Sequence, residues 1–245
     1  NQNGKAFGEL TTLARGDDLD LDIPEYLPNE VTVRFADMNG SGSTDIVWIS
    51  NQGQVRYLDL FAERPNLLVR MENGIGRIMT TRYGSSVRHA AAAREAGEPW
   101  ARGLQQPMLT AEENRTWNTH DGVVRRELLR YADPHYDGVE RAFRGYGRVV
   151  VTNPEGPNTE AQIDDITFDV GVDDPYHHGK EVQVETYSGE RLIYRETQVY
   201  DDCDVAGIPE DPGALAKPIR FICQTQTETK VFEGLADAES VTTRF

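Results

Sequence analysis

Short runs of apolar and β-branched residues, separated by turn-forming residues, recur along almost the whole chain. Such runs favour β-strands, because branched and aromatic side chains pack well on a pleated surface that alternates between two faces. Asn73-Gly74 is the strongest hairpin signal, since an asparagine–glycine pair adopts the tight turn that joins antiparallel strands. The pattern therefore predicts an all-β fold with antiparallel strands. The expected strands cover residues 31–36, 46–50, 55–60, 67–71, 77–83, 123–131, 141–152, 163–170, 180–187, 191–200 and 219–231.

One stretch favours a helix instead. Ser86–Ala96 contains a run of alanines, begins with serines that are typical helix caps, and is followed by Gly97 and Pro99. Its length predicts a single short helix packed on a sheet.

The chain is strongly acidic, with a formal net charge of -16. This charge argues against non-specific binding of nucleic acid and against docking on an anionic membrane, since both surfaces repel it. No apolar run approaches the roughly 18–20 residues that span a bilayer. We therefore expect no nucleic-acid partner and no direct insertion into a membrane.

Charge and turn formers divide the chain into three expected parts. Residues 66–153 contain more arginine than acidic side chains and no lysine, whereas both flanks are acidic. The run 153–158 is dense in proline, glycine and asparagine and coincides with one of these changes. We expect boundaries that separate residues 1–65, 66–153 and 154–245. The chain starts at Asn1 without a methionine, so we expect a piece of a longer protein.

Two cysteines, Cys203 and Cys223, lie in the acidic C-terminal part. A domain of this size does not need a disulfide to fold, and two cysteines do not form a disulfide framework. We therefore expect free buried thiols, with a single bridge that pins the intervening loop as the alternative. Residues 201–218, which hold Asp, Gly and three prolines, are expected to form a long acidic loop.

The segment with the most definite chemistry is the run from Asp37 to Asp45, in which oxygen-bearing side chains alternate with other residues. Calcium takes six to eight hard oxygen ligands, and a tight loop supplies them as it curls round the ion. Gly42 permits the sharp turn that such a loop needs. Trp48 stands where an EF-hand has its bidentate glutamate, and this excludes an EF-hand. The candidate calcium ligands are Asp37, Asn39, Ser41, the backbone carbonyl of Ser43, and Asp45.

With its flanks, Phe35-Ala36 before and Ile46-Val47-Trp48 after, this loop resembles the calcium loops of FG-GAP and VCBS-type propeller blades. The resemblance implies a structural calcium ion and a β-propeller-type blade over residues 1–65. The alternative is an Asx-rich turn held by its own side-chain hydrogen bonds, without metal.

Longer motifs follow in a fixed order. They are Asn73-Gly74-Ile75-Gly76-Arg77, Thr81 to Ser86, Ala96 to Trp100, and the run from Tyr136 to Gly147. Their order and spacing resemble the middle region of the B component of the insecticidal toxin complex (Tc) family, which includes the plasmid virulence protein B toxins. The resemblance is strongest over residues 30–150 and continues loosely through 163–200.

In that family a β-propeller precedes strands that wind into a hollow Rhs/YD-repeat shell, which encloses a toxic segment supplied by the C component. The propeller closes the shell and docks on the pore-forming A component. The resemblance implies that residues 66–153 form the middle region and that residues 154–245 begin the shell. It also implies a secreted, extracellular toxin complex.

Enzyme interpretations find little support in the residues. The run Gly145-Tyr146-Gly147 lacks the third glycine and the helix of a dinucleotide loop. The cluster from Asp173 to His178 is better explained as a solvated turn than as a metal site, because adjacent strand histidines point to opposite faces. We therefore expect a non-catalytic scaffold that helps to encapsulate and deliver a toxic polypeptide. The alternative is a calcium-dependent adhesion or carbohydrate-binding β-module.

Overall fold

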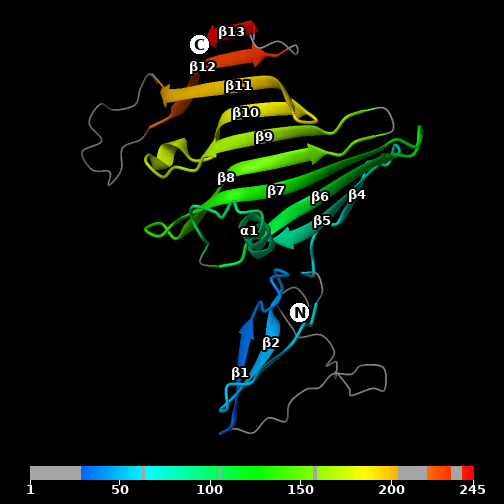
Figure 1. Cartoon of the computed structure of the whole chain (residues 1–245), viewed down its shortest axis with the longest axis vertical. Coiled ribbons are helices and arrows are strands. Elements are labelled where there is room, and N and C mark those ends of the chain that lie inside the picture. The colour runs from blue at the N-terminus through cyan, green and yellow to red at the C-terminus, as the bar shows by residue number, and fades with distance from the viewer. Residues whose placement is uncertain (1–28, 62–63, 105, 157–158, 204–219, 233–238) are drawn as a thin grey trace. The chain divides into compact units, whose positions relative to one another are not determined.

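A computed structural model describes residues 29–61, 64–104, 106–156, 159–203, 220–232 and 239–245 (Figure 1). It divides into two units, residues 1–39 with 43–62 and residues 40–42 with 63–245. The expected division into 1–65, 66–153 and 154–245 stays a prediction. Residues 1–28 of the expected blade and most of the expected acidic loop lie outside the described residues.

The described strands of the first unit form a three-stranded antiparallel sheet in the order β1-β2-β3 (Figure 1). The tight turn after β2 follows from Gly53, whose φ of 81° is the left-handed region that glycine adopts without strain. Val47, in the middle strand, is the apolar side chain of this sheet that is buried among the described residues. The strands are β1 (Val31–Ala36), β2 (Asp45–Ser50) and β3 (Val55–Leu58).

The second unit is built on one ten-stranded sheet in which each strand pairs antiparallel with the next in sequence, from β4 to β13 (Figure 1). The sheet continues through the β8–β9 connection without a break. This meander confirms the predicted all-β, antiparallel fold. The strands are β4 (Arg70–Glu72), β5 (Arg77–Ser85), β6 (Leu109–Asn118), β7 (Val124–Asp137), β8 (Ala142–Asn153), β9 (Gln162–Asp169), β10 (Lys180–Ser188), β11 (Arg191–Asp202), β12 (Ile222–Val231) and β13 (Glu239–Arg244).

Strands β6 and β13 were not expected from the sequence. β6 reads LTAEENRTWN, in which consecutive polar residues hide the apolar alternation. It forms a strand because β5 and β7 offer hydrogen-bonding partners on both sides. Strand formation depends on such neighbours more than on intrinsic propensity.

The predicted helix is confirmed as α1, Ser86–Glu95, which packs on β7 and β5. Its expected serine cap is wrong, because Ser85 at the N-cap position makes no side-chain capping hydrogen bond. The hydroxyl of Ser86 instead accepts a hydrogen bond from the backbone N–H of Met108 at 2.9 Å. Gly97, with φ at 80°, ends the helix as expected.

The register of the large sheet gives it two different faces, because residues directly opposite in neighbouring strands point to the same side. One face, here called the charged face, carries ion pairs in which Arg148 donates to Asp165 at 2.8 Å and Arg195 donates to Glu185 at 2.6 Å. The opposite face, here called the apolar face, carries aliphatic side chains on the same central strands. These are Leu129, Val149, Val151, Ile166 and Val184.

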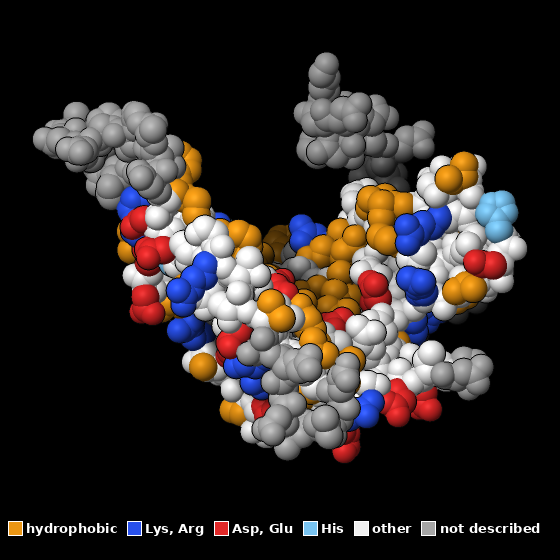
Figure 2. Space-filling view, turned by 90° about the horizontal axis from the view of Figure 1, so that it is seen from above, with side chains coloured by type: hydrophobic (Ala, Val, Ile, Leu, Met, Phe, Trp, Pro, Cys, Tyr) orange, Lys and Arg blue, Asp and Glu red, His pale blue; other side chains and the backbone are white. Residues whose placement is uncertain are grey.

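Few side chains of either unit are enclosed. Among the described residues, the buried apolar side chains are Val47, Val170 and Pro134. Figure 2 shows hydrophobic side chains gathered where this face of the molecule is hollowed. The large sheet is therefore a single layer with half-exposed faces and one helix packed on it, rather than a wall around a filled core.

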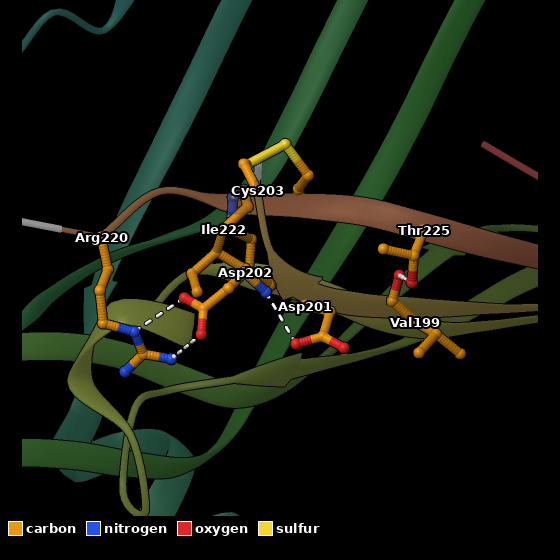
Figure 3. The surroundings of a disulfide bond; sticks show 9 residues. Val199, Asp201, Asp202, Cys203, Arg220, Ile222 and Thr225 are labelled. Carbon is orange, nitrogen blue, oxygen red and sulfur yellow. Dashed lines mark hydrogen bonds and ion pairs between the residues drawn. A yellow bond between two sulfur atoms is a disulfide. The ribbon is translucent and has the colours of Figure 1, made fainter. Parts of the chain in front are cut away.

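The two cysteines form a disulfide, so the expectation of free thiols is wrong (Figure 3). β11 and β12 are neighbours, and their pairing brings the two Cα atoms to 5.2 Å, a separation that a disulfide spans. Next to the bridge, Arg220 donates two hydrogen bonds to the carboxylate of Asp202, at 2.7 and 3.0 Å (Figure 3). These contacts close the base of the connection between the two strands.

Candidate functional site

The loop from Asp37 to Asp45 contains one buried carboxylate. The side chain of Asp45 is fully buried, and its Oδ2 accepts a hydrogen bond from the backbone N–H of Met38 at 2.8 Å. Its Oδ1 is also buried and has no hydrogen-bond partner among the described residues. Such an orphaned carboxylate oxygen is rare in native proteins and is the donor that calcium prefers.

The other predicted ligands make contacts of their own. The hydroxyl of Ser43 donates to the carbonyl of Phe61 at 2.8 Å. The ligand predicted from Ser43 is its own backbone carbonyl, which this hydrogen bond does not involve. The amide nitrogen of Asn39 donates to Asp59 at 2.7 Å. Asp37 follows β1 directly, and Ser41 is buried and is counted with the second unit. The predicted donors are oxygen atoms, the ligand type that calcium takes, and calcium binding itself stays a prediction.

Asp59 was missed by the sequence analysis. It lies beyond β3, outside the loop, and no spacing rule connects it with Asn39. Its Oδ1 also accepts a hydrogen bond from the backbone N–H of Phe61 at 3.0 Å. Asp59 therefore orients two residues that contact or belong to the loop.

The hairpin between β7 and β8 carries the longest motif, and its tip is held by one carboxylate. Asp137 accepts hydrogen bonds from the backbone N–H groups of Val139 and Glu140, at 2.9 and 3.0 Å. It also accepts one from Arg144 at 3.0 Å, and this bond is the main cause that lowers the pKa of Asp137. The acidic and basic residues of the motif thus build the turn.

The aromatic residues of the same motif form a cluster. The ring of Tyr146 lies 4.8 Å from that of Tyr131, 5.3 Å from Phe143 and 6.1 Å from Trp100, measured between centroids. Burial raises the pKa of Tyr146 to about 12. A phenol with that pKa is a poor acid–base group near neutral pH. The cluster therefore serves packing, and the ring of His89 in α1 joins it through Tyr131 at 5.2 Å between centroids.

A second carboxylate, missed by the sequence analysis, lies on the charged face. Glu113 is buried and pairs with Arg126, Arg115 and Arg82. The side-chain hydrogen bonds from Arg126 and then Arg115 lower the pKa of Glu113 to about 2. Sequence reasoning could not find Glu113, because its ion pairs depend on the pairing of β6 with β5 and β7, and β6 was not an expected strand. This cluster joins β5, β6 and β7 by charge and holds no group poised for catalysis.

The cluster from Asp173 to His178 forms a short turn. Asp174 accepts the backbone N–H of Tyr176 at 3.0 Å and thereby caps the 3-10 helix η1, Pro175–His177. It also accepts a hydrogen bond from Arg220 at 2.8 Å. The described part of the chain contains no group of three or more His, Cys, Asp or Glu side chains arranged to hold a metal ion.

The remaining candidates for catalysis lie apart. The run Gly145-Tyr146-Gly147 lies inside β8 and opens no helix. His89 is in α1, where burial is the main cause that lowers its pKa, and His135 is in β7. His120 lies in the β6–β7 turn, with its Nε2 at 3.0 Å from the carbonyl of Ile75. No described helix is long and apolar enough to cross a membrane.

Comparison with known proteins now identifies the chain at family level. The model of the family described as "Insecticide toxin TcdB middle/N-terminal region" matches residues 19–174, more than half of the chain. The chain belongs to the insecticide toxin TcdB middle/N-terminal region family. The resemblance inferred from the motifs is thereby confirmed.

Solved structures agree with membership of this TcdB family. The crystal structure of TcdB2-TccC3 has a TM-score of 0.70 at 19% identity and covers 86% of this chain. The Photorhabdus luminescens Tc holotoxin pore has a TM-score of 0.73 at 18% identity, again over 86%. At these identities the likeness shows the fold alone. This chain spans 13% of the length of either matched chain. None of the curated proteins matches it.

Proposed function

We propose that this chain is a non-catalytic wall segment of a Tc-type toxin B component, which helps to enclose and deliver a toxic polypeptide. The proposed partners are a C component that carries the toxic segment and a pore-forming A component, in a secreted complex. The large sheet is proposed to be wall of Rhs/YD type, and the first unit to be a propeller-type blade.

The observation that carries this proposal is the single-layer architecture of the second unit. The sheet has ten consecutive antiparallel strands, half-exposed faces and almost no buried apolar side chains among the described residues. Because it lacks the close-packed core of a globular domain, it is suited to line a hollow space. The likeness to TcdB2-TccC3 and to the Tc holotoxin pore supports the same interpretation.

The chemistry of the apolar face is consistent with an inner surface. Asp164 lies opposite Val151 and accepts a hydrogen bond from the Thr186 hydroxyl at 2.8 Å. Glu196 lies opposite Val184 and accepts one from a neutral amide at 2.9 Å. Neither acid forms an ion pair among the described residues. We infer that this face lines the hollow and that its strands β9 and β11 present uncompensated negative charge, which disfavours tight adhesion of acidic cargo at that part of the face.

We also propose that the loop from Asp37 to Asp45 binds calcium in a structural role. The orphaned Oδ1 of Asp45 supports this, because a bound cation supplies the missing partner. Calcium titration with and without chelator, followed by the thermal unfolding midpoint, tests it. Calcium is expected to raise the midpoint, and Asp45→Asn is expected to abolish that rise. A midpoint indifferent to calcium in the unsubstituted chain contradicts the proposal.

The wall function is tested in the parent protein co-expressed with its C component. Val149→Asp combined with Ile166→Asp places two carboxylates opposite each other on the apolar face of central strands. We expect the toxic segment to lose its protection from added protease in this variant. Val139→Asp is the matched control, because Val139 is 94% exposed at a hairpin tip.

Two other outcomes would count against the proposed wall function. Protease protection that is identical in all three proteins contradicts a wall role for this sheet. A native protein of 27.5 kDa that folds cooperatively and binds glycans only with calcium supports the adhesion module instead. Blotting of the native source against this chain distinguishes these outcomes by mass.

A further inference from the structure

A cleft of about 370 Å³ lies between two hairpin turns of the large sheet. One turn joins β4 to β5 and contributes Asn73, Ile75 and Arg77, and the other joins β6 to β7 and contributes His120 and Val123. The cleft is separate from the Asp37–Asp45 loop. It lies on the same side of the large sheet as the apolar face, because Arg125 and Leu129 of β7 point to one side, but on β5, β6 and β7 rather than on the central strands. The motif Asn73 to Arg77, singled out in the sequence, forms one of its walls.

Both walls are fixed by hydrogen bonds. Oδ1 of Asn73 accepts the backbone N–H groups of Ile75 and Arg77, at 3.0 and 2.9 Å. Thr119 donates its backbone N–H to the carbonyl of Gly76 at 2.8 Å, which ties the two turns together. The backbone of both turns is therefore preorganised.

Two arginines line this cleft without a partner of their own. Arg77 lies opposite Asn118 and Arg125 lies opposite Thr116, so the two side chains share one face and flank β6 from both sides. Neither guanidinium has a hydrogen bond or ion pair among the described residues. Asp121 also lines the cleft. Its carboxylate accepts from the backbone N–H of Val123 at 2.9 Å and from the amide of Asn118 at 2.8 Å, and it forms no ion pair with either arginine among the described residues.

The contrast with the opposite face is direct. There Arg115 and Arg126, the immediate sequence neighbours of Thr116 and Arg125, are both paired with Glu113. Beside the two unpaired guanidinium groups, the cleft has two exposed apolar side chains, since Ile75 is 77% and Val123 is 49% exposed. A bare inorganic anion uses only the arginines, whereas an acidic polypeptide uses both features.

We propose that this cleft binds an acidic–apolar segment of a partner polypeptide. Arg77 and Arg125 hold one of its carboxylates, and Ile75 and Val123 pack against the apolar residues beside that carboxylate. Guanidinium groups form strong charge-assisted hydrogen bonds with carboxylates, and a central arginine with adjacent apolar contacts is typical of binding hot spots. The inference is independent of the proposed wall function.

The test measures binding of two synthetic peptides to the full chain by calorimetry. One peptide alternates glutamate with leucine, and the other alternates glutamine with leucine. We expect only the glutamate peptide to bind, and Arg77→Gln and Arg125→Gln each to weaken that binding about tenfold or more. Ile75→Ser is expected to weaken it by a smaller factor.

The matched control is Arg94→Gln, which removes the same charge from α1 outside the cleft and is expected to leave binding unchanged. Thermal unfolding of each variant shows that the fold is intact. Equal binding of both peptides, or equal loss with Arg94→Gln, overturns the proposal. Binding of inorganic phosphate as tight as that of the peptide also overturns it and assigns the cleft to a bare oxyanion.

Discussion

The carboxylate of Glu113 is buried among three arginines, and this makes the stability of three strands sensitive to one proton. Its pKa is lowered to about 2 from an ordinary 4.5, first by the hydrogen bond from Arg126 and then by that from Arg115. A depressed carboxyl pKa contributes stability that is fully present above the ordinary pKa and is lost as the pH falls through the depressed one. The relevant window runs from pH 4.5 down to about 2.

Glu113→Gln is expected to lower the urea midpoint at pH 7, because a neutral amide loses the ionic hydrogen bonds. The deficit relative to the unsubstituted chain is expected to shrink as the pH falls from 4.5 toward about 2. Urea unfolding between pH 7 and pH 2 measures both effects. Glu127→Gln, at an exposed site on β7, is the control and is expected to change neither. A deficit that does not vary with pH contradicts the assignment.

Gly76 shows how one backbone conformation joins two turns. Its φ is 97°, and a Cβ placed there lies 2.7 Å from ring atoms of His120 and from the hydroxyl of Thr119. Gly74, in the same turn, has φ at 74° and open space around it. Substitution at both positions therefore distinguishes two costs. Backbone strain arises at either glycine, whereas a clash between the turns arises only at Gly76.

We expect Gly76→Ala to destabilise the chain by more than Gly74→Ala, with strain alone costing of order 1–3 kcal/mol at either position. Thermal unfolding of the two variants measures the difference. Equal losses imply that only backbone strain matters and that the contact between the turns is unimportant.

At the scale of elements, the β11–β12 hairpin is closed by two different devices. The disulfide between Cys203 and Cys223 joins the strands covalently, and Arg220 binds both Asp202 and Asp174. The ion pair between Arg220 and Asp174 also ties the hairpin to the turn before β10, because Asp174 caps η1 in that turn. The hairpin is thus held to its partner strand and to a neighbouring connection.

Replacing both cysteines with serine is expected to cost about 3 kcal/mol of unfolding free energy, since the bridge closes a loop with a sequence separation of 20. Urea unfolding under oxidising conditions measures this loss. Reduction of the unsubstituted chain is expected to reproduce it. A reductant effect of the same size in the double variant shows that the bridge is not responsible.

At the scale of the whole molecule, each sheet has open edges and each has exposed apolar side chains. β4 and β13 end the large sheet among the described residues, and Leu68 before β4 and Val241 in β13 are 60% and 66% exposed. Unpaired strand edges with apolar side chains are templates for association. This property is consistent with the wall segment proposed above.

We therefore expect the isolated chain to elute in size exclusion ahead of a 27.5 kDa monomer. Val241→Lys places a charge on the β13 edge and is expected to shift elution toward the monomer, because edge lysines oppose strand pairing. Val139→Lys, at the exposed hairpin tip, is the control. A monomeric elution of the unsubstituted chain contradicts the expectation.

The candidate site was only partly predictable. Asp45 was selected as a ligand from spacing alone, and the structure adds that its Oδ1 is buried without a partner. Asp59 and Glu113 were not found, because their roles depend on contacts with residues far along the chain. The serine cap failed because the hydroxyl of Ser85, at the N-cap position, donates to the carbonyl of Gly40 in a distant segment instead.

What the sequence alone determined is local: the strand and turn pattern, the single helix, the alternating oxygens of residues 37–45 and the motifs that assign the family. These follow from side-chain shape and spacing within a few residues. Only the tertiary structure decided the disulfide, strand β6, and the placement of Arg77 and Arg125 on one face at either side of β6. Each depends on strand register, which brings distant residues together and is fixed by the pairing of the whole sheet.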